Sequence, residues 1–329
     1  MIRAFLYDAN GHDQEIEVPS HQLPNLEEQQ LLWIDVTGRE DGDIRRLAPM
    51  LALHPRSVSE CISGDRRFSL VNYGDYVHFD VATIDLSEGG KASAPKLGRS
   101  ERLDVAIGGG WILTVHDGPL QFLEDFRDQD RGETLIGALT AASLAASLLD
   151  WHLAVYLKAL EDVEAFADRV DLRMLSGRTV RDDLLNDLVQ ARRYISSLRR
   201  SLAPQGSVFY GLSRPDLVLS ADSKAIDSYR DLERRFERVL DSIEHGRELV
   251  QSSFDLFTTR TAETTNNLIR RLTFIGIVLG ALGGVAGVFG MNFETPYPKS
   301  GLVGFWAVVA GFLVVTLVAA IVGRARRWF

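Results

Sequence analysis

The sequence of 329 residues contains a single cysteine, Cys61. One cysteine cannot form an intrachain disulfide, which excludes a disulfide scaffold, and it also excludes a zinc site built from several cysteines or a dithiol redox pair. The seven histidines are scattered without the paired spacing typical of metal ligands. The fold must therefore be stabilised by packing.

The sequence also lacks the local motifs of nucleotide-binding enzymes. No GxGxxG pattern follows a predicted strand, and no GK[ST] tripeptide occurs. We find no nucleophile paired with a base either. The sequence therefore predicts a protein that is not an enzyme and has no small organic substrate.

Proline is absent from residues 120–203 and 216–295, where apolar residues recur three and four apart. This spacing indicates helices with one apolar face. In the second stretch the pattern enters an uncharged segment without a helix breaker, so we predict one helix from about residue 222 to 289, roughly 100 Å long. The apolar stretch at residues 135–149 is too short for a membrane span and leads into a charged helical pattern, which favours a buried soluble helix.

Charge is distributed unevenly along the chain. Residues 272–329 hold one acid and four bases, a balance of +3, and the remaining 44 acids and 32 bases leave −12 for residues 1–271. An acidic body without a basic stripe argues against nucleic acid, because binding to phosphates needs clustered Lys and Arg. It favours cations as the small partner.

Two segments without charged residues, 272–289 and 301–323, are long enough to cross a lipid bilayer as helices. Residues 290–300 join them, and the tail at residues 324–329 is basic. Arginines precede the first span and follow the second, so the positive-inside rule predicts an inner-membrane, multi-pass protein with both termini in the cytoplasm. The N-terminus carries no apolar run of the signal-peptide type.

The first part of the chain, residues 1–135, alternates short apolar runs with turn residues, which is typical of an α/β domain with a mixed sheet. Gly108, Gly109 and Gly110 separate the last two predicted strands and indicate a hairpin. The predicted strands are residues 31–36, 76–85, 103–107 and 111–116, with helical patterns at 43–53 and 55–63. We therefore predict an α+β membrane protein, in which residues 136–271 form a helical region and a stalk between the α/β domain and the membrane hairpin.

Glycines recur at spacings of three and four in the first span, which places most of them on one helix face. They include Gly276, Gly280, Gly283 and Gly287. Such a face either packs closely against another membrane helix or lines a pore. Just before the span, the polar residues Thr264 to Asn267, Asn266 among them, form either a solvated stretch or a polar vestibule.

The tripeptide Gly290-Met291-Asn292 ends the first span and precedes a short loop and a last span that finishes in GRARRWF. With this placement the sequence resembles the CorA family of divalent-cation channels. The segments SLLDWHLAVYLKALEDVEAFADRVD and SYRDLERRFERVLDSIEHGRELVQSSFDLF resemble the cytoplasmic helices and the start of the stalk in that family. The likeness covers nearly the whole chain and is strongest beyond about residue 140.

The resemblance implies a homopentamer in which five copies of the first span surround a pore. Gly290, Met291 and Asn292 would form a selectivity filter at the outer mouth, with the Asn292 amide oxygens facing the hydrated ion and Glu294 concentrating cations in the outer loop. The implied pore-lining residues are Asn266, Leu272, Gly276, Gly280, Gly283 and Gly287. Neutral oxygen ligands suit Mg²⁺, which gives up its water reluctantly, and they release it easily.

Family members also carry cytoplasmic metal sites between subunits that hold the channel closed. By resemblance, Asp231 matches the stalk acid of that site, and Asp85 matches its partner on the neighbouring α/β domain. Two carboxylates from different chains would repel each other unless a divalent ion lay between them. The alternative is that both are unrelated surface acids.

The sequence departs from the family at Gly280, where the hydrophobic gate carries bulky residues, although Leu272 is retained. Phe289 stands where tyrosine is common. Such divergence also fits zinc-transporting relatives such as ZntB. The primary hypothesis is a Mg²⁺ channel that also passes Co²⁺ or Ni²⁺. A Zn²⁺ transporter on the same scaffold and a membrane-tethered scaffold or sensor that conducts nothing are the alternatives.

Overall fold

The computed structural model describes residues 1–18, 23–27, 29–65, 67–86, 97–128, 136–175, 182–214, 223–291 and 301–325. The chain divides into two compact units. The first comprises Met1–Gly177 and Arg181–Phe254, and the second comprises Arg178–Val180 and Asp255–Phe329. The predicted selectivity residues Asn292 and Glu294 lie outside the described residues.

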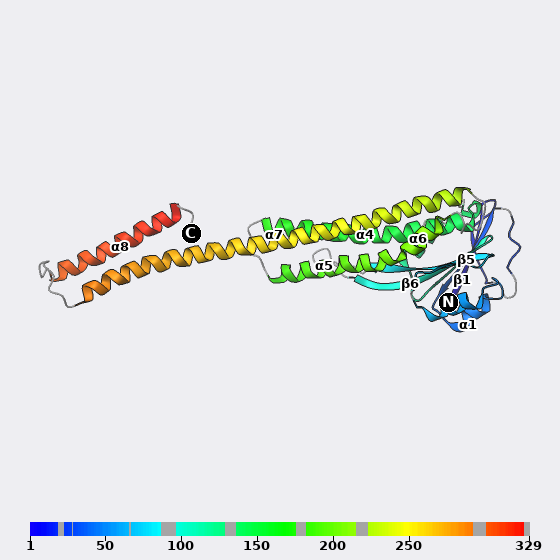
Figure 1. Cartoon of the computed structure of the whole chain (residues 1–329), viewed down its shortest axis with the longest axis horizontal. Helices are drawn as coiled ribbons and strands as arrows, with labels where there is room; N and C mark the ends of the chain where they lie inside the picture. The colour runs from blue at the N-terminus through cyan, green and yellow to red at the C-terminus, as the bar shows by residue number, and fades with distance from the viewer. Residues whose placement is uncertain are drawn as a thin grey trace. The chain divides into compact units, whose positions relative to one another are not determined.

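The first unit contains a seven-stranded mixed sheet in the order β2-β1-β3-β7-β6-β5-β4 (Figure 1). Its strands are β1 Ile2–Asp8, β2 Gln14–Ile16, β3 Gln30–Thr37, β4 Leu70–Asn72, β5 Tyr76–Leu86, β6 Leu97–Gly108 and β7 Trp111–His116. Only β3 and β7 pair in parallel among the described strands, with Leu32 opposite Trp111. Every residue of β7 is buried, including the polar Thr114 and His116, as expected for a strand covered on both faces.

The predicted strands correspond to β3, β5, β6 and β7, and the glycine hairpin between β6 and β7 is confirmed. Gly110 has a φ of +86°, a conformation that favours glycine. Strands β1, β2 and β4 were not predicted. Two of them are only three residues long, and the apolar residues of β1 do not alternate.

Helices α1 (Asp41–Leu47) and α2 (Pro55–Ser63) lie between β3 and β4 in the chain. The prediction of a helix over residues 43–53 was too long, because α1 ends at Leu47. Pro49 has no N–H to donate to the carbonyl four residues earlier, and its ring disfavours helical geometry in the residue before it. The prediction for residues 55–63 matches α2, which is capped at its N-terminus by the His54 side chain and followed by Gly64 in the left-handed conformation.

Long helices follow the sheet in the first unit. They are α3 (Gln121–Asp128), α4 (Ala141–Leu175), α5 (Asp182–Leu202), α6 (Gly206–Leu212) and the first part of α7 (Ser223–Gly290). In Figure 1 the first part of α7 runs alongside α4 and α5. A Cβ atom on Gly246 of α7 would lie 2.4 Å from Leu160 in α4 and 2.7 Å from Ile195 in α5, so the three helices pack closely. The start of α4 is buried, as predicted for this apolar stretch.

In the short 3₁₀ helix η1 (Ile136–Ala138), Gly137 packs directly against the backbone of Gln29 and Ala9. A Cβ atom on Gly137 would lie 2.5 Å from the Gln29 carbonyl oxygen and 2.6 Å from the Ala9 nitrogen. Backbone cannot rotate away as a side chain can, so Gly137→Ala should lower the free energy of unfolding by about 2–3 kcal/mol. Gly42→Ala in α1 is the control: no described atom lies within 4 Å of its Cβ position, and alanine should stabilise the helix by roughly 0.5–1 kcal/mol. Thermal unfolding of the full chain in detergent measures the stability of both variants. Equal Tm values for Gly137→Ala and Gly42→Ala would contradict the prediction.

The second unit contains the continuation of α7 to Gly290 and the helix α8 (Gly301–Ala325). The prediction of one helix from about residue 222 to 289 is thus matched by Ser223–Gly290. Both helices contain apolar windows long enough to cross a membrane, and these windows are not buried against other described residues. The fold is therefore an α/β domain, a long helix and two C-terminal apolar helices.

Candidate ion pathway and buried polar clusters

The glycine face of α7 has no neighbour among the described residues. No described atom lies within 4 Å of the Cβ position of Gly276, Gly280, Gly283 or Gly287. Leu272 is 67% exposed on the same face, and Asn266, six residues earlier in the helix, is exposed as well. A face of small residues with open space in front of it can accept another helix or line a pore.

The predicted filter begins where α7 ends. Gly290 is the last residue of the helix, and the Met291 backbone N–H donates to the Val288 carbonyl oxygen at 3.3 Å. The Met291 side chain is 55% exposed. Asn292 comes two residues after the end of the helix in the sequence, and its own geometry and that of Glu294 lie outside the described residues.

Asp231 lies on α7 within the first unit, with 69% of its side chain exposed and an ion pair to Arg234 one turn later. It lines an open cavity of about 400 Å³ together with Asp150 of α4, which Arg235 holds at 2.7 Å. The exposed carboxylate can therefore reach a ligand or another chain. Asp85 lies in β5, but its side chain is outside the described residues, so its predicted pairing stays a prediction.

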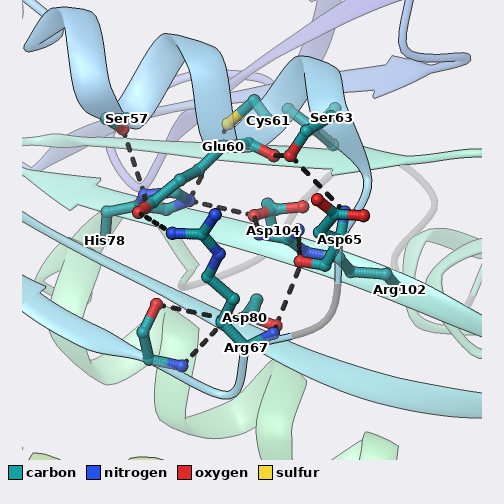
Figure 2. Close-up of polar contacts among 12 residues, drawn as sticks. Ser57, Glu60, Cys61, Ser63, Asp65, Arg67, His78, Asp80, Arg102 and Asp104 are labelled. Carbon is teal, nitrogen blue, oxygen red and sulfur yellow. Dashed lines mark hydrogen bonds and ion pairs between the residues drawn. The ribbon is translucent and has the colours of Figure 1, made fainter.

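Sequence reasoning missed a buried charge cluster, and Figure 2 labels all of its residues except Arg39. We use this name for seven residues from four places in the chain: Arg39 after β3, Glu60 and Cys61 of α2, His78 and Asp80 of β5, and Arg102 and Asp104 of β6. In the antiparallel pair of β5 and β6, Asp80 faces Asp104. Alternate residues share a face of a sheet, so His78, Asp80, Arg102 and Asp104 project toward the same side.

His78 is the centre of this cluster. Its Nε2 atom lies 3.1 Å from Asp104 Oδ1 and 3.7 Å from Cys61 Sγ, and its Nδ1 atom lies 3.1 Å from Ser57 Oγ. Burial lowers the pKa of His78, but the hydrogen bonds to Asp104 and Cys61 outweigh burial and raise the pKa to about 10. The ring of His78 is therefore protonated at neutral pH.

Arginines and backbone groups hold the acids of the cluster. Arg39 donates to Asp104 Oδ2 at 2.6 Å, and Arg102 also contacts Asp104. Burial raises the pKa of Asp104, but the hydrogen bond to His78 and the nearby guanidiniums lower it overall. Asp80 accepts three backbone N–H bonds of 2.9–3.1 Å from the segment that precedes β4. The sequence signal was polar residues inside otherwise apolar strands, at His78, Asp80 and Asp104.

A second buried histidine, His152 of α4, behaves in the opposite way. Its Nε2 atom lies 3.1 Å from Gln205 Oε1, and Gln205 donates in turn to the Ala82 carbonyl oxygen of β5 at 2.8 Å. Burial lowers the pKa of His152 to about 4, and the hydrogen bond to Gln205 offsets this only in part. His152 is therefore neutral at pH 7 and links the helices to the sheet.

The depressed pKa of His152 predicts a loss of stability in acid. The unfolded chain takes up a proton near pH 6.5, whereas the folded chain does so only near pH 4. The free energy of unfolding should therefore fall by about 3 kcal/mol as the pH drops from 6.5 to 4. Thermal unfolding across this range should show a smaller fall for His152→Gln than for the wild type. His245→Gln, at a side chain 71% exposed, is the control and should follow the wild type. A wild-type curve parallel to that of His152→Gln would contradict the prediction.

Known proteins resemble this chain both in sequence and in fold. The chain is 21% identical to the cobalt/magnesium transport protein CorA of Thermotoga maritima over 93% of this chain and 86% of that protein. The complete CorA magnesium transporter of Methanocaldococcus jannaschii superposes with a TM-score of 0.74 at 17% identity, covering 99% and 98% of the two chains. The ZntB cytoplasmic domain of Vibrio parahaemolyticus superposes with a TM-score of 0.61 at 15% identity, covering 80% of this chain and 99% of that domain.

A family model described as CorA-like Mg²⁺ transporter protein matches residues 28–324, which is most of the chain. The match includes strands β3 to β7, the long helix and the apolar helices up to residue 324, whereas β1 and β2 precede it. It agrees with the structural similarity to a complete transporter over nearly the full length of both chains. The chain therefore belongs to the family of CorA-like Mg²⁺ transporter proteins.

Proposed function

We propose that this chain is a divalent-cation channel of the inner membrane, assembled as a homopentamer, with Mg²⁺ as the main ion and Co²⁺ or Ni²⁺ as further ions. Family membership supports transport of a divalent cation. The observation that carries the proposal is the open glycine face on a helix that continues without a break from the acidic first unit to Gly290. Five such faces around one axis would enclose a path wide enough for a hydrated ion.

In this proposal the five Asn292 side chains form the filter at the outer mouth, beside Gly290 and Met291. Their amide oxygens accept hydrogen bonds from the water around the ion, which spares the cost of removing that water. Glu294 raises the local cation concentration at the entrance. An inside-negative potential of 100 mV then supplies about 4.6 kcal/mol for a divalent ion.

Flux measurements test the proposal. Purified chain in proteoliposomes with an inside-negative potential should admit Mg²⁺, reported by an enclosed fluorescent indicator, whereas empty liposomes should not. A pentamer is expected in detergent by size. Absence of Mg²⁺ entry by a correctly assembled pentamer would overturn the Mg²⁺ assignment, and a protein that is not pentameric and conducts nothing would favour a scaffold or sensor.

A Zn²⁺ transporter is the second candidate, and the similarity to the ZntB cytoplasmic domain favours it. The same liposomes distinguish the two, because Zn²⁺ entry at low micromolar concentration without Mg²⁺ entry would replace the first proposal. Entry of Mg²⁺ without entry of Zn²⁺ into these liposomes would exclude the second candidate.

We further propose that Asp231 and Asp85 of neighbouring subunits hold a regulatory Mg²⁺ ion. The exposed side chain of Asp231 supports this role. Asp231→Asn removes a negative ligand, so the Mg²⁺ concentration that protects the chain from trypsin should rise about tenfold or more, the equivalent of roughly 1.4 kcal/mol. Asp227→Asn is the matched control, since Asp227 lies one turn earlier with 74% of its side chain exposed. Equal Mg²⁺ protection of both variants would contradict the assignment.

A further inference from the structure

We propose that Cys61, His78 and Asp104 form a binding site for one transition-metal ion of the Zn²⁺ class inside the α/β domain. The Sγ, Nε2 and carboxylate oxygen atoms of these residues all lie within 4.8 Å of one another. Each of the three residues is at most 2% exposed. Figure 2 shows Cys61 on the helix above the sheet, with His78 and Asp104 on the strands below it.

The distances fit a single ion. In tetrahedral zinc sites the Zn–S distance is about 2.3 Å and the Zn–N and Zn–O distances are about 2.0–2.1 Å, which separates neighbouring ligand atoms by roughly 3.3–3.6 Å. Here His78 Nε2 is 3.1 Å from Asp104 Oδ1 and 3.7 Å from Cys61 Sγ. Cys61 Sγ and the Asp104 oxygen lie within 4.8 Å of each other, so side-chain rotations that bring these two atoms closer by up to roughly 1.3 Å would place an ion between the three.

A buried carboxylate oxygen without a hydrogen bond provides independent support. Glu60 Oε2 is buried, has no hydrogen-bond partner among the described residues, and lies 3.7 Å from His78 Nδ1. A histidine that binds a metal through one ring nitrogen almost always donates its other N–H to a carboxylate, a carbonyl or water. An ion on Nε2 would fix the hydrogen on Nδ1. Ser57 Oγ, 3.1 Å from Nδ1, and Glu60 Oε2, 3.7 Å from it, are the nearby acceptors for that hydrogen.

The arginines already pair with the carboxylates of the cluster. Asp104 contacts Arg39 and Arg102, Asp80 contacts Arg102, and Glu60 contacts Arg56 and Arg67. A bound dication would therefore rely on the Cys61 thiolate, which forms as the ion displaces the thiol proton and offsets part of the added charge.

The arginines do not block the proposed ligand atom. Arg39 bonds to the other Asp104 oxygen, Oδ2, at 2.6 Å. Arg102 contacts Oδ1 itself, but a carboxylate oxygen has more than one lone pair and can accept a hydrogen bond while it binds a metal. Both guanidiniums then orient the carboxylate toward His78.

The donor set selects the class of ion. Thiolate and imidazole favour Zn²⁺ and similar transition metals, whereas Mg²⁺ prefers oxygen ligands in octahedral geometry. The site would therefore respond to ions other than the Mg²⁺ of the proposed pathway. Because its ligands come from α2, β5 and β6, a bound ion would cross-link the helix to the sheet.

Cobalt spectroscopy on the wild-type chain is the direct test. Cys61 is the only cysteine, so thiolate-to-Co²⁺ charge-transfer absorption in the near ultraviolet can arise only from this residue. The full-length protein in detergent, stripped of metal, should develop this band, saturate near one Co²⁺ per chain, and lose it on addition of Zn²⁺. X-ray absorption of the Zn²⁺ form should show a sulfur neighbour at about 2.3 Å. Absence of both signals would overturn the proposal without any need for a variant.

Variants then identify the ligands. Cys61→Ser and His78→Gln should abolish the band, and Glu60→Gln should retain it with about 10–100-fold weaker Zn²⁺ affinity in calorimetry. His245→Gln on exposed α7 is the control and should bind as the wild type does. Equal Zn²⁺ affinity of Cys61→Ser and the wild type would also overturn the proposal. Wild-type Mg²⁺ flux is measured separately, so a missing cobalt band with normal flux rejects this site alone.

Discussion

Replacing Asn292 with alanine is expected to reduce Mg²⁺ entry into proteoliposomes by about 100-fold or more. In the proposed pentamer this one substitution removes five amide oxygens, each of which accepts a hydrogen bond from water around the ion. Each such bond contributes roughly 1 kcal/mol, and every 1.4 kcal/mol corresponds to a factor of ten. The ion would then have to give up water without compensation.

The variant needs a control for assembly and for the loss of an asparagine. Asn186→Ala, at an exposed position of α5, should conduct like the wild type. Size measurements in detergent should show the same oligomer for all three proteins. Undiminished Mg²⁺ entry through an intact Asn292→Ala oligomer would show that the filter lies elsewhere.

Arg39→Met is expected to have the largest effect on folding, a loss of about 3–5 kcal/mol in the free energy of unfolding. The Arg39 side chain is 6% exposed, and its guanidinium donates to Asp104 Oδ2 at 2.6 Å and to the carbonyl oxygens of Cys61 and Arg102 at 2.7 and 2.9 Å. Methionine is shorter than arginine and has no hydrogen-bond donor, so it leaves a buried carboxylate and two carbonyls with fewer partners.

An exposed pair on the neighbouring helix provides the matched control. Arg45 bonds to Asp41 at 2.6 Å, but the two side chains are 67% and 57% exposed. Water replaces such a partner readily, so Arg45→Met should cost less than about 1 kcal/mol. Thermal unfolding in detergent compares the two substitutions, and similar Tm losses would show that Arg39 is not a buried structural charge.

Much of the fold could be predicted from the sequence because its signals are local. The apolar runs of β3 and β7 end at turn residues, and the spacing along residues 223–290 persists without proline. The exceptions also have local causes. Pro49 ended α1 earlier than its apolar pattern indicated, and β2 and β4 are too short to show any period.

The two candidate sites differ in how much of each could be predicted from the sequence. A tripeptide at the end of a span is a linear signal, whereas Cys61, His78 and Asp104 meet only after α2 packs on β5 and β6. A single cysteine excludes a site of several cysteines, but it leaves a mixed set of thiolate, imidazole and carboxylate. Spacing rules detect ligands on one helix or loop and cannot detect ligands that topology brings together.

The parallel pairing of β3 with β7 has a consequence for synthesis of the protein. Strand β3 can pair with β7, with Leu32 opposite Trp111, only after β7 has left the ribosome. From there to residue 272, where the first apolar segment begins, translation at about 5–20 residues per second takes roughly 10–30 seconds. The nascent chain therefore has time to complete its sheet before the membrane-insertion machinery meets a hydrophobic helix, and chaperone demand should centre on the interval before β7 emerges.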